Sequence, residues 1–212
     1  MFGPNPNAVH PNQQIPSICY IKNVITRSNI QVGEYTYYDD AVTGGEDFEA
    51  HVTHHYAFIG DKLIIGKFCA IGKGVEFVMN GANHRMNSIT TYPFNIFGHG
   101  WEKCTPSLDE LPFKGDTVVG NDVWIGQNVT VLPGVHIGDG AIIGANSVVA
   151  SDIPPYTVAA GNPCRVVRNR FDRELTDYLL TLRWWDWDPE KIFRNHASLC
   201  SGDFEQIRRI EP

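Results

Sequence analysis

A period of six residues runs through the middle of this chain. From Val119 onward every sixth residue is a β-branched aliphatic one through six consecutive copies, and Gly follows it in four of them. The first positions are Val119, Ile125, Val131, Ile137, Ile143 and Val149, and the fifth positions are Val123, Val129, Val135, Ala141, Ser147 and Ile153. The same phase occurs earlier, where Ile59, Ile65 and Ile71 each precede a Gly.

An α-helix cannot use this period, because six residues advance about 600° around its axis and scatter the repeated side chains over several faces. In extended backbone the side chains alternate between faces. The fifth position and the next first position, two residues apart, therefore point to the same side. Each copy is expected to be a short strand with two inward side chains, and its Gly is expected at the turn with a positive φ.

Short strands that turn every six residues wind into a parallel β-solenoid, in which successive turns bury one another. We therefore predict an all-β solenoid as the fold. A β-sandwich is the alternative, but its strands do not keep an unbroken register over six copies.

The repeats are interrupted by a segment without periodicity, at about 78–114. A long irregular loop in a compact protein is functional or disordered, and five aromatic residues in this one argue against disorder: Tyr92, Phe94, Phe97, Trp101 and Phe113. We predict a single domain over 1–212, with β-helix coils at about 17–77 and 115–165, an inserted functional loop at 78–114, and a C-terminal helical cap at 166–212.

Two helices are expected in that C-terminal segment. Asp172 is a suitable N-cap for apolar residues at helical spacing, and Asp188 followed by Pro189 marks the start of a second helix. Trp184, Trp185 and Trp187 lie between the two. Because the end coils of a solenoid expose apolar interior, we expect these aromatic residues to close one end of it.

Composition excludes several function classes. The formal net charge is −7, and the small basic cluster of Arg165, Arg168 and Arg170 cannot supply the phosphate contacts of a nucleic-acid surface. No run approaches the roughly 20 apolar residues of a membrane span, and residues 1–16 lack the apolar run of a signal peptide, so a cytoplasmic location is expected. The five cysteines are scattered and odd in number, which argues against a disulfide framework or a zinc site.

The histidines are the first candidates for catalysis. His51, His54 and His55 form a cluster, but a metal site needs further ligands in fixed geometry. His136 lies within a coil, where a solvent-exposed position is expected. His84 lies at the start of the irregular loop, where the sequence alone favours a structural role over a catalytic one.

Several segments resemble one enzyme family. They read MNGANHRM around His84, then TYPFN, GWEK, KGDTVVGNDVWIG, AAGNP and RWWDW. Together they are similar to the xenobiotic acetyltransferases of the hexapeptide-repeat class, specifically the streptogramin A (virginiamycin) branch, over nearly the whole chain. The resemblance implies a left-handed parallel β-helix, a homotrimer, 78–114 as the catalytic and acceptor loop, and His84 as the catalytic base. The chemistry suits that role, because an alcohol needs a base near neutral pH to act as a nucleophile. The handedness rests on the resemblance, since ordinary strand crossovers are right-handed.

The resemblance also implies the binding residues. Acetyl-CoA is expected along the coils at Trp124, Gly144, Ala145, Ala160 and Arg165. The acceptor is expected at Tyr37, Tyr56, Pro93, Phe94 and Leu111. From the sequence alone, coil packing is a strong competing explanation for Trp124, Gly144 and Ala145, and loop packing explains Phe94 and Leu111 nearly as well.

Three functions are compared. The first is acetyl transfer to a hydroxyl of a group A streptogramin, which inactivates the antibiotic. The second is the same chemistry on chloramphenicol or another hydroxylated small molecule. The third is a zinc carbonic anhydrase or a non-catalytic solenoid, but residues 119–153 contain only His136 as a histidine ligand, too few for that zinc site. No metal is expected.

Overall fold

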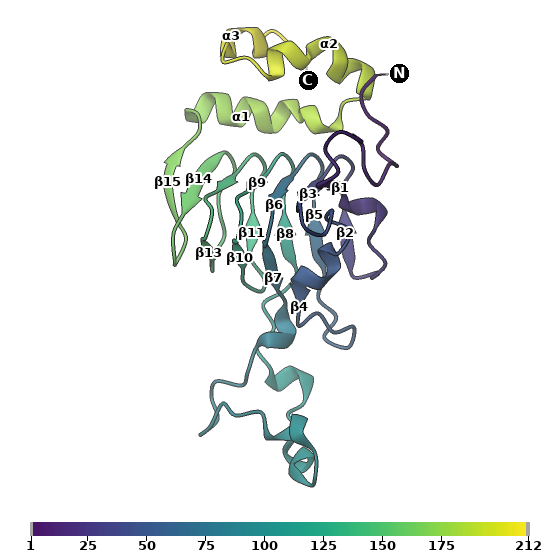
Figure 1. The fold of residues 1–212 in the computed structure, drawn as a ribbon. Coiled ribbons are helices and arrows are strands. Elements are labelled where there is room, and N and C mark those ends of the chain that lie inside the picture. The colour runs from purple at the N-terminus through teal and green to yellow at the C-terminus, as the bar shows by residue number, and fades with distance from the viewer. Residues whose placement is uncertain (1, 211–212) are drawn as a thin grey trace.

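The repeats fold into three β-sheets in the computed structural model, which describes residues 2–210. Sheet I has the order β1-β3-β6-β9-β12-β14-β15, sheet II β2-β5-β8-β11 and sheet III β4-β7-β10-β13. The chain visits sheets II, I and III in turn, and the strands stack side by side (Figure 1). The strands are β1 (Ile18–Tyr20), β2 (Ile30–Val32), β3 (Tyr37–Asp39), β4 (Val52–Thr53), β5 (Leu63–Ile65), β6 (Ala70–Gly72), β7 (Glu76–Val78), β8 (Thr117–Val119), β9 (Trp124–Ile125), β10 (Thr130–Val131), β11 (His136–Ile137), β12 (Ile142–Ile143), β13 (Val148–Val149), β14 (Thr157–Ala160) and β15 (Arg165–Asn169).

The register of the sheets follows the repeat. Val119 pairs with Ile137 in sheet II, and the equivalent first positions pair eighteen residues apart in sheets I and III, always in parallel. One turn of the chain therefore contains three six-residue copies, one for each sheet. The ends of sheet I differ from the expected pattern, because β1 pairs with β3, and β15 with β14, in antiparallel orientation.

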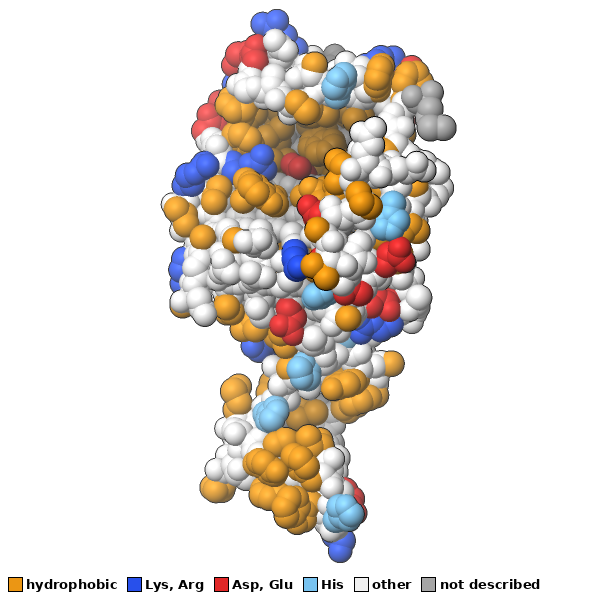
Figure 2. Space-filling model, in the orientation of Figure 1, with side chains coloured by type: hydrophobic (Ala, Val, Ile, Leu, Met, Phe, Trp, Pro, Cys, Tyr) orange, Lys and Arg blue, Asp and Glu red, His pale blue; other side chains and the backbone are white. Residues whose placement is uncertain are grey.

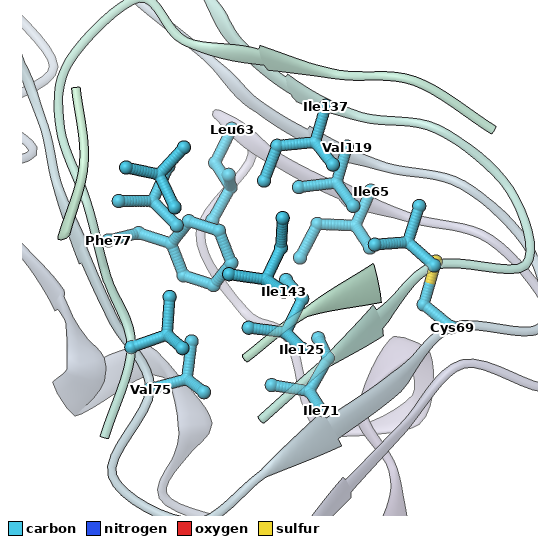
Figure 3. Close-up of a cluster of buried hydrophobic side chains, with 14 of the residues drawn as sticks. Leu63, Ile65, Cys69, Ile71, Val75, Phe77, Val119, Ile125, Ile137 and Ile143 are labelled. Atoms are coloured by element: carbon cyan, nitrogen blue, oxygen red, sulfur yellow. The ribbon is translucent and has the colours of Figure 1, made fainter. Parts of the chain in front are cut away.

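The core lies inside the three sheets. All first- and fifth-position side chains from Val119 to Ile153 are at most 3 % exposed, which confirms the prediction that both positions face inward. Figure 3 shows Ile125, Ile143 and Ile71 converging there with side chains from the other sheets. Each such aliphatic side chain contributes about 1.5–3 kcal/mol by burial.

Most second-position glycines have a different role from the one predicted. Gly60 has the expected positive φ of 86°, but the φ angles of the others are not positive, and neighbouring turns approach them too closely for a side chain. A Cβ on Gly66 would lie 2.5 Å from the carbonyl oxygen of Gly120, and one on Gly120 would lie 2.7 Å from the amide nitrogen of Asp139. The positive φ angles fall on the fourth position of the copies, at Asp122, Asn128, Gly134, Gly140 and Asn146.

The predicted helices form with the predicted caps. Asp172 Oδ1 accepts a hydrogen bond from the Leu175 amide at 2.8 Å, and Asp188 Oδ1 accepts one from the Lys191 amide at 2.8 Å. The helices are α1 (Arg173–Leu182), α2 (Pro189–Leu199) and the short α3 (Phe204–Ile207). Within residues 2–210, no helix has both the length and the apolar composition that crossing a membrane requires.

The C-terminal helices cover the side of the stack, so the prediction that the tryptophans close its end is wrong. Helix α1 packs its leucines on Tyr156, and the Trp184 ring lies 4.8 Å from the ring of Phe68. Tyr156 and Phe68 occupy the same corner, between sheets II and I, but belong to different turns. Helix α1 therefore runs along this corner, across the stacked turns (Figure 1).

The irregular loop leaves the stack at another corner. It connects β7 of sheet III to β8 of sheet II, and we call this place the loop corner. Sheets II and III meet at this corner, so sheet I forms the opposite side of the three-sided stack. Figure 1 shows the loop projecting away from the strands on the side remote from α1. Short 3-10 turns shape it: η3 (Asn80–Ala82), η4 (Phe94–Phe97), η5 (Trp101–Cys104) and η6 (Leu108–Glu110).

Candidate active site

His84 follows η3 on the exposed surface of the loop. Its Nδ1 atom lies 2.7 Å from the carbonyl oxygen of Thr91. A carbonyl oxygen only accepts hydrogen bonds, so Nδ1 carries the ring proton and the neutral ring keeps its lone pair on Nε2. The loop thus holds the imidazole in the tautomer that a general base needs.

Aromatic residues surround the next part of the loop. The Tyr92 and Phe94 rings lie 4.7 Å apart, and the Phe94 and Trp101 rings 5.0 Å apart, both in edge-to-face contact. Pro93 lies between Tyr92 and Phe94 and is half-buried. Tyr92, Phe94 and Trp101 remain 40–51 % exposed, and Figure 2 shows hydrophobic side chains gathered on the projecting loop.

Tyr56 and Leu111 lie close to the loop segment that carries His84. A Cβ on Gly81 would lie 2.5 Å from the Tyr56 ring, which brings that ring against the root of the loop. Arg85, the residue after His84, forms a 2.8 Å ion pair with Glu110, the residue before Leu111. Four of the five predicted acceptor residues therefore belong to the loop or contact its root.

Tyr37 is the exception, and it lies with Trp124 on sheet I. Tyr37 pairs with Ala70, which in turn pairs with Trp124. Their chain neighbours Tyr38 and Ile125 are fully buried, so Tyr37 and Trp124 face outward in one row of the sheet. The Trp124 side chain is 57 % exposed.

Tyr37 also lines a mainly apolar cavity of about 660 Å³ between the N-terminal segment, the edge of sheet I and helix α2. Tyr20, Phe68 and Phe193 are among the other lining residues, and none of the lining residues comes from the loop. Tyr37 therefore belongs to a different part of the molecule from His84.

The remaining predicted cofactor residues meet at the corner between sheets I and III. A Cβ on Gly144 would lie 2.9 Å from the Cβ of Ala160, and Ala160 pairs with Arg165 on β15. Ala145 follows Gly144 and is exposed. The exposed Arg165 donates from Nη1 to the carbonyl oxygen of Cys164 at 2.9 Å. The structure thus brings these four residues together at one edge of sheet I.

The predicted site residues consequently form two groups. His84, Tyr56, Pro93, Phe94 and Leu111 lie at or beyond the loop corner. Tyr37 and Trp124 lie on sheet I, the face opposite that corner, and the other cofactor residues lie at the edge of sheet I next to sheet III. A single chain does not bring the two groups together.

The cluster of histidines near residue 54 is dispersed in the fold. His51 Nε2 lies 3.2 Å from the Tyr38 hydroxyl, while His54 is exposed. His55 is buried and donates from Nε2 to the carbonyl oxygen of Asp61 at 3.0 Å. Across residues 2–210, no three His, Cys, Asp or Glu side chains are grouped so as to hold a metal ion.

Three residues of the site were not identified from the sequence. Thr91 acts through its backbone carbonyl, which leaves no side-chain pattern to recognise. Asp61 and Asn80 are buried at the root of the loop and bond to each other. They lie nineteen positions apart in irregular segments, so no spacing rule connects them.

Known proteins match this fold and this loop. Residues 116–151 match the bacterial transferase hexapeptide family (six repeats). Over 207 residues the chain is 50% identical to virginiamycin A acetyltransferase of Staphylococcus aureus, a match that covers 98% of this chain and 93% of that protein. The chain belongs to the hexapeptide-repeat xenobiotic acetyltransferases.

Two further relatives extend the comparison. This acetyltransferase is 64% identical over 156 residues to a probable macrolide acetyltransferase of Lysinibacillus sphaericus, covering 74% of this chain and 87% of that protein. It is 38% identical over 188 residues to a chloramphenicol acetyltransferase of Escherichia coli, covering 87% and 89%. The acetyltransferase thus has relatives that are named for three different antibiotics.

Proposed function

We propose that this chain transfers an acetyl group from acetyl-CoA to a hydroxyl of a group A streptogramin and so inactivates the antibiotic. The observation that carries the chemistry is the 2.7 Å contact between His84 Nδ1 and the Thr91 carbonyl oxygen, which leaves Nε2 free to accept a proton. The choice of acceptor rests on the match to virginiamycin A acetyltransferase over 98% of the chain.

His84 acts as base and then as acid. Its Nε2 accepts the acceptor's hydroxyl proton while the hydroxyl oxygen forms a bond to the thioester carbonyl carbon. The tetrahedral oxyanion collapses, the carbon–sulfur bond breaks, and Nε2–H returns the proton to the departing sulfur. The products are the acetyl ester and CoA thiol, and the imidazole ends neutral. No acetyl-enzyme is needed.

The proposed acetyl-CoA site lies along the edge of sheet I. Gly144, Ala145 and Ala160 have side chains small enough for a ligand to approach the main chain. Arg165 beside them is exposed, and a guanidinium can bind phosphate oxygens in a bidentate manner. Trp124 supplies an exposed apolar surface one strand further along the sheet.

We propose a closed homotrimer of left-handed β-helices with composite active sites. His84 lies beyond the loop corner and Trp124 lies on the opposite face, so the loop of one copy must reach sheet I of a second copy for the base to meet the thioester. The exposed aromatic residues of the loop support this assembly, because exposed apolar patches of this kind mark contact surfaces. Three copies related by a threefold axis make three equivalent sites.

In this assembly the acceptor binds between copies. Tyr56, Pro93, Phe94 and Leu111 come from the loop side, and Tyr37 comes from sheet I of the neighbour. These residues are mostly apolar with two hydroxyl groups, as expected for a site that takes a large apolar molecule and fixes it with few polar contacts.

Acetyl transfer to chloramphenicol is the second candidate, supported by the 38% identity to a chloramphenicol acetyltransferase over 87% of the chain. The deciding experiment follows CoA thiol release with acetyl-CoA and a panel of acceptors: a group A streptogramin, chloramphenicol, a macrolide and a simple sugar. The highest kcat/KM is expected for the streptogramin, with the ester confirmed by mass spectrometry. A higher value for any other acceptor would reject the proposed substrate.

A further inference from the structure

One buried side chain joins the two roots of the His84 loop. Asn80 Nδ2 donates to the carbonyl oxygen of Gly115 and Asn80 Oδ1 accepts from the Lys114 amide, both at 2.8 Å. On the outgoing side Asn80 Oδ1 also accepts from Asn83 Nδ2 at 3.2 Å. Nδ2 makes a second bond, to Asp61, so the amide group uses all four of its hydrogen-bonding positions.

Asn83 strengthens the connection between the roots. Its Nδ2 also donates to the carbonyl oxygen of Pro112 at 2.9 Å. The backbone that leads directly into His84 is therefore tied to the returning chain at two places. Backbone groups in irregular segments have no regular strand partner, so these side-chain bonds fix the direction in which the loop leaves the stack.

Asp61 anchors Asn80 to the stack. Its Oδ2 accepts from the Asn80 amide at 2.9 Å and from Asn80 Nδ2 at 2.8 Å. The Asp61 side chain is fully buried, and the residue comes two positions before Leu63, the start of β5. Because β5 pairs with β2 and β8 on either side, the anchor is held by three strands.

The same pairing occurs at the corner between sheets II and I, where there is no insertion. Asn121 donates from its amide and from Nδ2 to Asp139 Oδ1, at 2.6 and 2.8 Å, and its Oδ1 accepts from the Lys67 amide at 2.9 Å. A hydrogen-bonded Asn–Asp pair thus connects neighbouring turns at both corners. Only the pair at the loop corner has the additional bonds that hold a loop.

We propose that Asp61 and Asn80 are positioning residues for the acetyl-transfer reaction, because they fix the direction of the loop and thereby the place of the His84 imidazole. This inference rests on the proposed function, in which His84 is the base. A displacement of about 1 Å at a reacting group can cost about 10²-fold in rate. Loss of the hydrogen-bond network formed by Asp61, Asn80 and Asn83 should therefore lower kcat even where the fold survives.

The test uses Asp61→Ala, which removes the acceptor of both Asn80 bonds, and Asn83→Ala, which removes only the outer bonds and leaves the buried pair intact. In both purified variants kcat should fall by about 10- to 100-fold, while KM for acetyl-CoA stays within about twofold. Hydrogen–deuterium exchange of the segment 83–92 should become faster. The matched control is Asp139→Ala, which removes the equivalent acceptor of the Asn121 bonds and should lower the melting temperature without changing kcat at 25 °C or exchange in the loop.

A double variant shows whether the network acts through His84. If it does, Asp61→Ala combined with His84→Ala loses no more kcat than His84→Ala alone. Further loss in the double variant would overturn the proposal, as would unchanged kcat or unchanged loop exchange in Asp61→Ala and Asn83→Ala. Retention of activity by His84→Ala defeats the proposed function itself, and this outcome is seen without the network variants.

Discussion

The Nδ1 atom of His84 lies 2.7 Å from the carbonyl oxygen of Thr91, seven residues further along the loop. This bond has two consequences. It fixes the tautomer with a free Nε2, and it holds the ring by contacts within the loop instead of contacts with the core. Removing the imidazole should therefore affect the reaction and leave the stack of strands intact.

His84→Ala should lower kcat by about 10²–10⁴-fold, the range for loss of a positioned general base. The melting temperature and the affinity for acetyl-CoA should stay near those of the wild type, because the imidazole contributes to neither. The thiol-release assay measures the change, and His99→Ala, which removes another exposed histidine of the same loop, is the control. A variant that keeps more than about a tenth of the wild-type kcat would show that His84 is not the base.

Gly66→Ala should destabilise the stack by about 1–3 kcal/mol, the usual cost of overpacking. The new Cβ would lie 2.5 Å from the Gly120 carbonyl oxygen, and backbone held in a sheet cannot move aside as a flexible side chain would. Thermal unfolding measures the effect. Gly202→Ala is the matched control, because its Cβ would meet no atom within 4 Å, and a melting temperature equally low in both variants would contradict the argument.

The sequence predicted the core far better than the corners. Every predicted inward side chain from Val119 to Ile153 is buried, because a strict period leaves one pattern of burial. The role of the second-position glycines was predicted wrongly except at Gly60, which has the expected positive φ. A Gly that permits a positive φ and a Gly that permits close approach look alike in sequence, and here Asp122 and Asn128 adopt the positive φ in its place.

The arrangement of the site was harder to predict from the sequence than the core, because its residues lie far apart along the chain. Loop-side and sheet-side residues were identified together by family resemblance, but no pattern shows that His84 and Trp124 lie on opposite sides of one chain. The position of helix α1 depends likewise on the contact between Phe68 and Trp184, residues more than one hundred positions apart. Such pairings follow from three-dimensional packing alone.

Asp122 makes the stability depend on pH. Burial raises the pKa of its carboxyl group to about 6, against the opposing effects of Arg170 and of a hydrogen bond from Trp184. Between the unfolded value of 3.8 and about 6, the folded state binds more protons than the unfolded state. Stability therefore falls as the pH rises through this window and stays lower above it.

Asp122→Asn removes this ionisation and can keep the positive φ, which Asn tolerates well. The stability of this variant relative to the wild type should therefore be greater at pH 8 than at pH 4.5. The change between the two pH values should be on the order of 1 kcal/mol, since the side chain is partly exposed and solvent screens the effect. Thermal unfolding of both proteins at the two pH values gives the comparison. A difference between them that does not change with pH would show that burial of Asp122 does not control this dependence.

The last prediction tests the composite site, in which His84 of one copy acts beside Trp124 of the next. His84→Ala and Trp124→Ala trimers should each be nearly inactive. Mixed trimers, made by co-expressing the two variants with different affinity tags, should regain activity, because roughly one site in three then joins an intact His84 to an intact Trp124. If both residues acted within one chain, no mixed trimer would contain a complete site.

Mixing His84→Ala with the double variant His84→Ala/Trp124→Ala is the control and should stay inactive, since no copy supplies the base. Mixed trimers without recovered activity would refute the composite site, and a fully active Trp124→Ala trimer would refute the placement of Trp124.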